Sequence, residues 1–112
     1  MAERILFDLD NTLYPSSSGL EDRAVARMMA FAAERLGLSA EETAARRREA
    51  LREYGTTLEW LRAEHGPVDP DRYYAAVHPE GEESILSPDP ELGRLLGAHP
   101  ARKWVFTNSP IE

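Results

Sequence analysis

The sequence has no cysteine, a single lysine and no apolar run of the roughly 18 residues that a membrane span requires. The missing cysteine excludes disulfides, thiolate catalysis and zinc–thiolate sites. Because no long apolar run is present, we expect no membrane partner. The opening residues pass directly into a short strand-like run rather than into a secretory leader, so we expect a cytoplasmic protein.

Positive charge is also scarce. The 112 residues include 20 acidic and 13 basic side chains, which give a net charge of −7. This balance argues against a nucleic-acid partner held by broad electrostatic attraction. One basic run, Arg46–Arg48 followed by Arg52, lies in a helical pattern among glutamates. We interpret it as a solvated helix face, and the alternative is a phosphate or nucleic-acid patch.

Two short β-rich runs lie near the two ends of the chain. Ile5–Asp10 is nearly continuously apolar, which is typical of a strand buried on both faces of a parallel sheet. Lys103–Asn108 is the second run, and both runs end in polar side chains. Ligands of open α/β sheets bind at the carboxyl ends of the strands. The sequence therefore predicts an α/β fold with a site at that edge.

Helices are predicted between the two runs from their start and stop residues. Three pairs have the spacing of a capping box: Ser18 with Glu21, Ser39 with Glu42, and Thr56 with Glu59. Two Asp-Pro pairs, at Asp69 and Asp89, put proline at a first helical position. The three histidines share a place beside glycine or proline at predicted helix ends: His65, His78 and His99. We interpret these histidines as C-terminal caps rather than as ligands.

Asp8 and Asp10 stand two residues apart at the end of the first run, so we expect their side chains on one face of the strand. Two carboxylates this close repel each other, and an apolar strand end makes both costly to ionise. A divalent cation removes that cost, and ligands that are all oxygen suit magnesium. The pair alone leaves open a second interpretation, in which the strand end is solvated and the aspartates are ordinary turn residues.

The surroundings of this pair favour the functional reading. Residues 7–13 read FDLDNTL, an apolar strand running into Asp-x-Asp-x-Thr, and residues 105–108 read VFTN, an apolar strand ending in threonine. They resemble the first and second motifs of phosphatases of the haloacid dehalogenase superfamily. The resemblance implies a Rossmann-like parallel sheet with an all-α cap inserted. It divides the chain into a core strand and loop over 1–17, the cap over 18–80 and a return to the core over 81–112.

The resemblance also implies a role for each motif residue. Asp8 would be the nucleophile that forms an aspartyl-phosphate, and Asp10 would be the general acid and later the base. Mg²⁺ would be held by the Asp8 carboxylate and the backbone carbonyl of Asp10. Thr107 and the backbone N–H of Asn108 would bind the phosphoryl oxygens. Thr12, the third residue of the substrate-binding set, would chiefly brace the loop after the strand.

The substrate class follows from finer similarities. The strings DNTLYP over 10–15 and TNSP over 107–110 look most like the pyrimidine 5′-nucleotidase branch, whereas other branches more often have glycine where Asn11 stands. We therefore expect a pyrimidine nucleoside 5′-monophosphate or a similar small phosphorylated metabolite. Five aromatic side chains offer either a base-stacking platform or, the reading we favour, ordinary core packing: Tyr14, Tyr54, Trp60, Tyr73 and Tyr74.

One departure from the family pattern concerns positive charge. The family uses a later lysine and a later acidic pair, which follow the second motif in family order, whereas Lys103 precedes that motif here. We therefore expect this chain to be the front part of the enzyme and inactive by itself. The alternative is a non-catalytic binding or interaction module derived from the same fold. In either case we expect self-association through the open edge of a two-stranded sheet.

Overall fold

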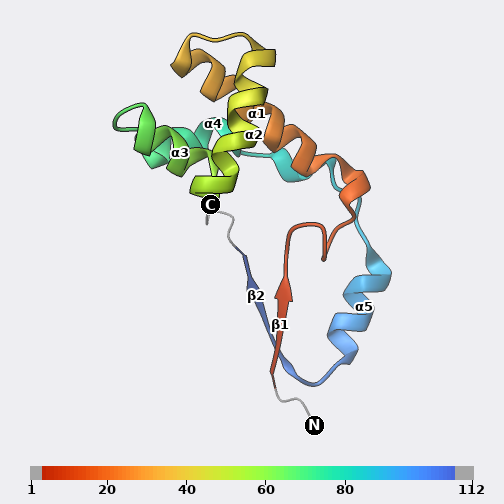
Figure 1. The fold of residues 1–112 in the computed structure, drawn as a ribbon. Coiled ribbons are helices and arrows are strands. Elements are labelled where there is room, and N and C mark those ends of the chain that lie inside the picture. Colours follow the sequence, from red (N-terminus) through yellow and green to blue (C-terminus); the bar gives the residue numbers. More distant parts are fainter. Residues whose placement is uncertain (1–3, 108–112) are drawn as a thin grey trace. The chain divides into compact units, whose positions relative to one another are not determined.

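The computed structural model describes residues 4–107 and shows a mixed α/β fold that is mostly helical (Figure 1). Its elements in chain order are β1 (Arg4–Asp8), α1 (Leu20–Leu36), α2 (Ala40–Tyr54), α3 (Thr57–Glu64), α4 (Pro70–Val77), α5 (Pro90–Ala98) and β2 (Arg102–Phe106). Short 3₁₀ turns lie at Ser16–Ser18 and Glu82–Ile85. Within 4–107, no helix has the length and apolar content needed to cross a membrane.

The two strands form a parallel pair, as the sequence predicted. The register runs from Arg4 opposite Arg102 to Asp8 opposite Phe106 (Figure 1). A parallel pair needs a long crossover, and here the crossover contains all five helices. The pairing places the carboxyl ends of both strands at one edge of the sheet.

The prediction that the first strand is buried on both faces was wrong. Ile5 and Phe7 are half-buried, but Leu6 between them is 70% exposed. On β2, Trp104 and Phe106 are 53% and 70% exposed. Side chains alternate between the faces of a strand, so Leu6, Trp104 and Phe106 share one face of the pair. No element within residues 4–107 buries this face.

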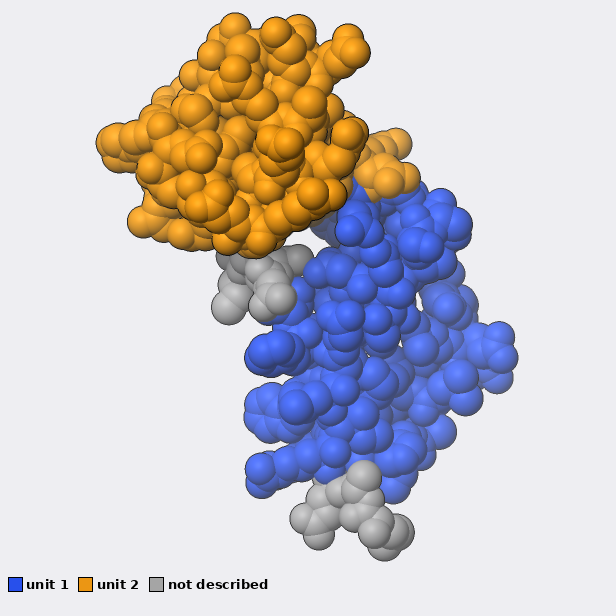
Figure 2. Space-filling view, in the orientation of Figure 1, with its two compact units in different colours: residues 1–21, 83–112 blue, residues 22–82 orange. Residues whose placement is uncertain are grey.

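Contacts divide the chain into two compact units (Figure 2). One comprises residues 1–21 and 83–112 and contains the sheet and α5; the other comprises residues 22–82 and contains most of α1 together with α2, α3 and α4. The sequence-based division put the helical insert at 18–80. The first residues of α1 group with the sheet, in agreement with the hydrogen bond from Asn11 Nδ2 to Glu21 Oε2.

The helical unit is built around a small apolar core. The largest side chains with almost no exposure are Trp60, Leu61 and Val77, and Tyr73 is 3% exposed. Tyr54 and Tyr74 pack against this cluster from its margin. Phe31 meets Tyr73 edge to face, with ring centroids 5.1 Å apart. Core packing is thus the observed role of these aromatics in the helical unit.

Most of the predicted caps form. Ser39 and Glu42 make both hydrogen bonds of a capping box, and the side chains of Thr56, Asp69 and Asp89 each accept a backbone N–H. The three histidines occupy the C-cap positions of α3, α4 and α5: His65, His78 and His99.

Two predictions about polar side chains need correction. Ser18 does not cap through Glu21: its hydroxyl accepts from the N–H of Leu20, because Ser18 belongs to a 3₁₀ turn that Gly19 ends at φ 81°. The arginine run is not uniformly solvated either. Arg47 turns inward, and its Nε donates to Thr57 Oγ1 at 2.8 Å. The buried threonine hydroxyl holds this one guanidinium against the core.

Replacing Leu61 tests the core of the helical unit. Leu61→Ala should lower the free energy of unfolding by about 2–5 kcal/mol, because the side chain is fully buried and leaves a cavity. Arg62→Ala is the matched control on the exposed side of the same helix and should stay within about 0.5 kcal/mol of the parent. Urea unfolding followed by circular dichroism measures both. Equal effects of the two substitutions would contradict the assigned core.

Candidate active site

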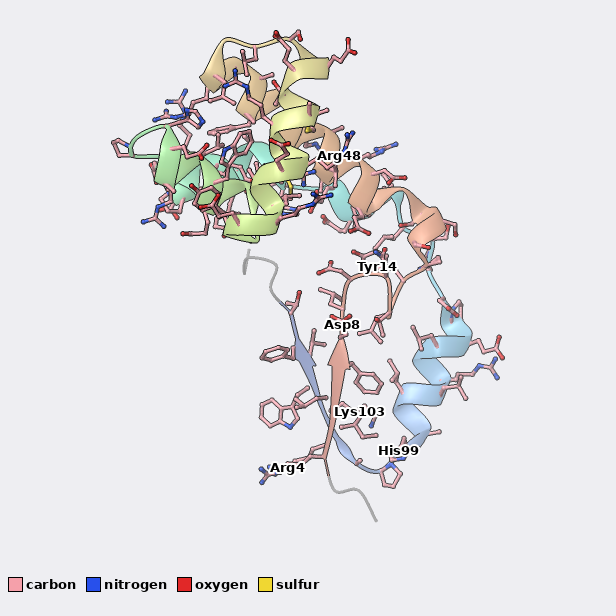
Figure 3. The ribbon with its side chains drawn as sticks, viewed as in Figure 1. Arg4, Asp8, Tyr14, Arg48, His99 and Lys103 are labelled. Atoms are coloured by element: carbon pink, nitrogen blue, oxygen red, sulfur yellow. The ribbon has the colours of Figure 1, made fainter. Side chains whose placement is uncertain are left out.

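The predicted site residues meet at the carboxyl edge of the sheet. Asp8 is the last residue of β1, and Thr107 directly follows β2. Thr107 Oγ1 donates to Asp10 Oδ2 at 3.1 Å, although 97 positions separate the two residues. The expectation that Asp8 and Thr107 lie at the ends of adjacent parallel strands is therefore confirmed. Figure 3 shows Asp8 at the tip of β1, on the side of the loop that carries Tyr14.

The segment after β1 forms a turn closed by backbone hydrogen bonds. The carbonyl of Leu9 accepts from the N–H groups of Thr12 and Leu13, at 3.2 and 3.0 Å. These bonds end the strand at Asp8, so Asp10 lies in the turn and not on the strand. The expectation that both aspartates leave one face of a strand was wrong. A turn, not the strand pleat, positions the second carboxylate.

This turn creates two similar side-chain hydrogen bonds, each between residues four positions apart. Thr12 Oγ1 donates to Asp8 Oδ2 at 3.2 Å, and the Tyr14 phenol donates to Asp10 Oδ1 at 2.7 Å. The turn folds the chain back, so that each aspartate is oriented by the hydroxyl four residues further on. The contact of Thr12 with Asp8 is that of a bracing residue.

Asn11 gives the turn its backbone shape. Its φ of 57° lies in the left-handed region, which asparagine tolerates better than other residues with a side chain. Its side-chain amide donates to the Glu21 carboxylate near the start of α1. Asn11 therefore allows the sharp turn and also ties it to the first turn of the following helix.

The Asp10 carboxylate is a hydrogen-bond acceptor at both oxygens. Oδ1 accepts from Tyr14 and Oδ2 accepts from Thr107. Burial raises the pKa of the Tyr14 phenol, and the hydrogen bond and charge of Asp10 raise it further. The phenol therefore remains protonated, and a donor, throughout the neutral range. Sequence reasoning considered Tyr14 only as a stacking or core aromatic, although its spacing of four from Asp10 was readable.

Solvent access differs across the site. Asp8 and Thr12 are exposed, whereas Asp10, Tyr14 and Thr107 are half-buried. The Asp8 carboxylate can therefore be reached from solvent, while the hydrogen-bonded group around Asp10 is partly shielded. This arrangement suits one accessible carboxylate for attack and one more enclosed carboxylate for proton transfer.

The donor atoms at this edge fit magnesium. The Asp8 carboxylate and the backbone carbonyl of Asp10 supply only oxygen, and magnesium is bound by one or two carboxylates together with water and substrate phosphate. Over residues 4–107 there is no group of three or more His, Cys, Asp or Glu side chains placed to hold a metal ion.

The other charged and polar candidates lie elsewhere. Lys103 stands opposite Ile5 in the sheet, and its ammonium donates to the carbonyls of His99 and Ala101 beyond the end of α5 (Figure 3). It is bound at the end of the sheet remote from Asp8. Asn108, predicted to bind phosphate through its N–H, lies outside the described residues. No known protein-family model matches the chain.

Substitutions of Asn11 separate its backbone role from its side-chain role. Both Asn11→Gly and Asn11→Ala remove the bond to Glu21, but only alanine also bears the cost of the left-handed conformation. Asn11→Ala should therefore be less stable than Asn11→Gly by about 1 kcal/mol in urea unfolding. If the alanine variant proves as stable as the glycine variant, the left-handed turn is not what holds this loop.

Proposed function

We propose that this chain carries the nucleophile end of a magnesium-dependent phosphomonoester hydrolase of the haloacid dehalogenase type. The observation that carries the proposal is that Asp8, Asp10 and Thr107 lie together at the carboxyl edge of the sheet. There the Thr107 hydroxyl donates a hydrogen bond to the Asp10 carboxylate. Motif order agrees with this: FDLDNTL supplies the first two residues and VFTN the third.

The first chemical step uses both aspartates. An Asp8 carboxylate oxygen attacks phosphorus, so that a phosphorus–oxygen bond to Asp8 forms while the bond to the leaving alcohol breaks. Protonated Asp10 gives its proton to the departing oxygen. Thr12 orients Oδ2 of Asp8, and we therefore assign the attack to Oδ1.

The second step returns the site to its starting state. The Asp10 carboxylate takes a proton from water, and the resulting hydroxide oxygen attacks the phosphorus of the aspartyl-phosphate. The bond to Asp8 breaks, inorganic phosphate leaves and both carboxyl groups are restored. Thr107 donates its hydroxyl to a phosphoryl oxygen during both steps. The Asp8 carboxylate and the backbone carbonyl of Asp10 would hold Mg²⁺, which would supply positive charge against the phosphoryl oxygens.

The proposed substrate is a small phosphorylated metabolite, with a pyrimidine nucleoside 5′-monophosphate as the first to test because of the resemblance in residues 10–15. We assign the helical unit, residues 22–82, the role of the inserted cap that selects the substrate. Trp60 and Tyr73 are buried in its core, so they cannot stack on a base without unpacking that unit.

A non-catalytic binding module is the second candidate, and the position of Lys103 favours it. Within residues 4–107, the ammonium that could balance a phosphoryl group is bound to carbonyls at the remote end of the sheet. We also propose self-association through the exposed face that contains Leu6, Trp104 and Phe106. Sedimentation at micromolar concentration should show a species larger than a monomer, and Trp104→Ser should shift it toward monomer.

Substitution of the two aspartates distinguishes the candidates. In a form that also carries the lysine and acidic segments of the family pattern, Asp8→Asn should abolish magnesium-dependent hydrolysis because it removes the attacking carboxylate. Asp10→Asn should slow hydrolysis by about 10²–10⁴-fold. Release of phosphate from a nucleoside monophosphate measures both effects. Asp89→Asn is the control, because Asp89 caps a helix and has no proposed part in the reaction. Near-normal turnover by Asp8→Asn would exclude the mechanism.

A further inference from the structure

The Tyr14 phenol makes a contact to which neither the motifs nor the proposed chemistry assigns a role. It donates to Asp10 Oδ1 at 2.7 Å, while Thr107 holds Oδ2 of the same carboxylate at 3.1 Å. Tyr14 is half-buried and belongs to the same compact unit as both residues. The carboxylate that moves protons in the proposed reaction is therefore fixed at one oxygen by a side chain to which that reaction assigns no step.

We infer that Tyr14 is a positioning residue for hydrolysis: it anchors Oδ1 of Asp10 and so assigns Oδ2 as the proton-transferring atom. The inference rests on the proposed function. Tyr14 acts through Asp10, so its effect is confined to the steps in which Asp10 gives or takes a proton.

The choice of Oδ2 follows from what Thr107 does. Thr107 is the proposed phosphoryl ligand, so the oxygen of Asp10 that it contacts faces the place where the phosphoryl group lies. A threonine hydroxyl has one hydrogen to donate. When a phosphoryl oxygen takes that hydrogen, Oδ2 loses this donor, and Tyr14 keeps Oδ1 in place. The proton on Asp10 is then directed to the leaving oxygen beside the phosphorus.

A second phenol–carboxylate pair provides the matched control. Tyr54 donates to Glu64 Oε1 at 3.1 Å within the helical unit, and Trp60 Nε1 donates to the other oxygen of that carboxylate at 2.7 Å. The chemistry of this pair resembles that of Tyr14 with Asp10, but Glu64 has no proposed part in the reaction. Tyr54→Phe thus removes a similar hydrogen bond without touching the site.

The leaving group of the substrate gives a readout that a purely structural tyrosine would not affect. An alkyl monoester, such as a nucleoside 5′-monophosphate, needs its leaving oxygen protonated, whereas p-nitrophenyl phosphate releases a stable phenolate that needs no acid. In the form that also carries the lysine and acidic segments of the family pattern, Tyr14→Phe should lower kcat/KM for the alkyl ester by about 10-fold or more, a part of the acid–base contribution. It should change kcat/KM for the aryl ester by less than about twofold, because kcat/KM reports only the steps up to loss of the leaving group and not the later proton transfer from water. Tyr54→Phe should change the rate for the two esters by the same factor.

A stability cycle tests the contact without any turnover. The unfolding constants of Tyr14→Phe, Asp10→Ala and the double variant should depart from multiplicative behaviour by at least about twofold, as for residues in direct contact. Additive effects would overturn the inference at its geometric basis. Coupling with an equal loss of kcat/KM for both esters would reduce Tyr14 to a structural residue and overturn its positioning role. If the parent form that carries the lysine and acidic segments turns over neither ester, the proposed function fails and this inference fails with it.

Discussion

The parallel pairing of β1 with β2 is the constraint on which the rest of the site depends. Nothing local in the sequence brings Thr107 to Asp10; the register that sets Asp8 opposite Phe106 does so across the whole helical crossover. The pairing has few supporting layers, because one face of the strands leaves Leu6 and Phe106 each 70% exposed. The geometry of the site therefore depends on the stability of a two-stranded sheet. Such a sheet is only marginally stable in water without further packing.

The turn after β1 places hydroxyl groups that orient the carboxylate oxygens of Asp8 and Asp10. The turn is closed on the carbonyl of Leu9, and at two positions it joins a hydroxyl to the carboxylate four residues earlier. Asn11 makes the turn possible at a left-handed φ and fastens it to the start of α1. A strand end alone would have placed two carboxylates side by side with like charges repelling. The turn separates their roles by giving each its own donor.

Much of this arrangement could be read from the sequence, and the failures have identifiable causes. Helix starts at Ser39, Thr56 and Asp69 were readable because capping is local chemistry. The end of β1 was misplaced by two residues because the turn depends on backbone hydrogen bonds that no side-chain pattern reveals. The inward position of Arg47 was missed because its partner, Thr57, lies on another helix.

The proposed mechanism requires that Asp8 becomes covalently phosphorylated. Acid quenching during turnover, followed by digestion and mass spectrometry, tests it directly because acyl phosphates survive brief exposure to acid. We expect one phosphoryl group on the peptide that contains Asp8, and none on that peptide from Asp8→Asn or without Mg²⁺. With p-nitrophenyl phosphate, whose leaving group needs no acid, Asp10→Asn should slow only the hydrolysis of the aspartyl-phosphate and so increase the trapped fraction. Magnesium-dependent turnover with the phosphoryl group on another residue would contradict the account.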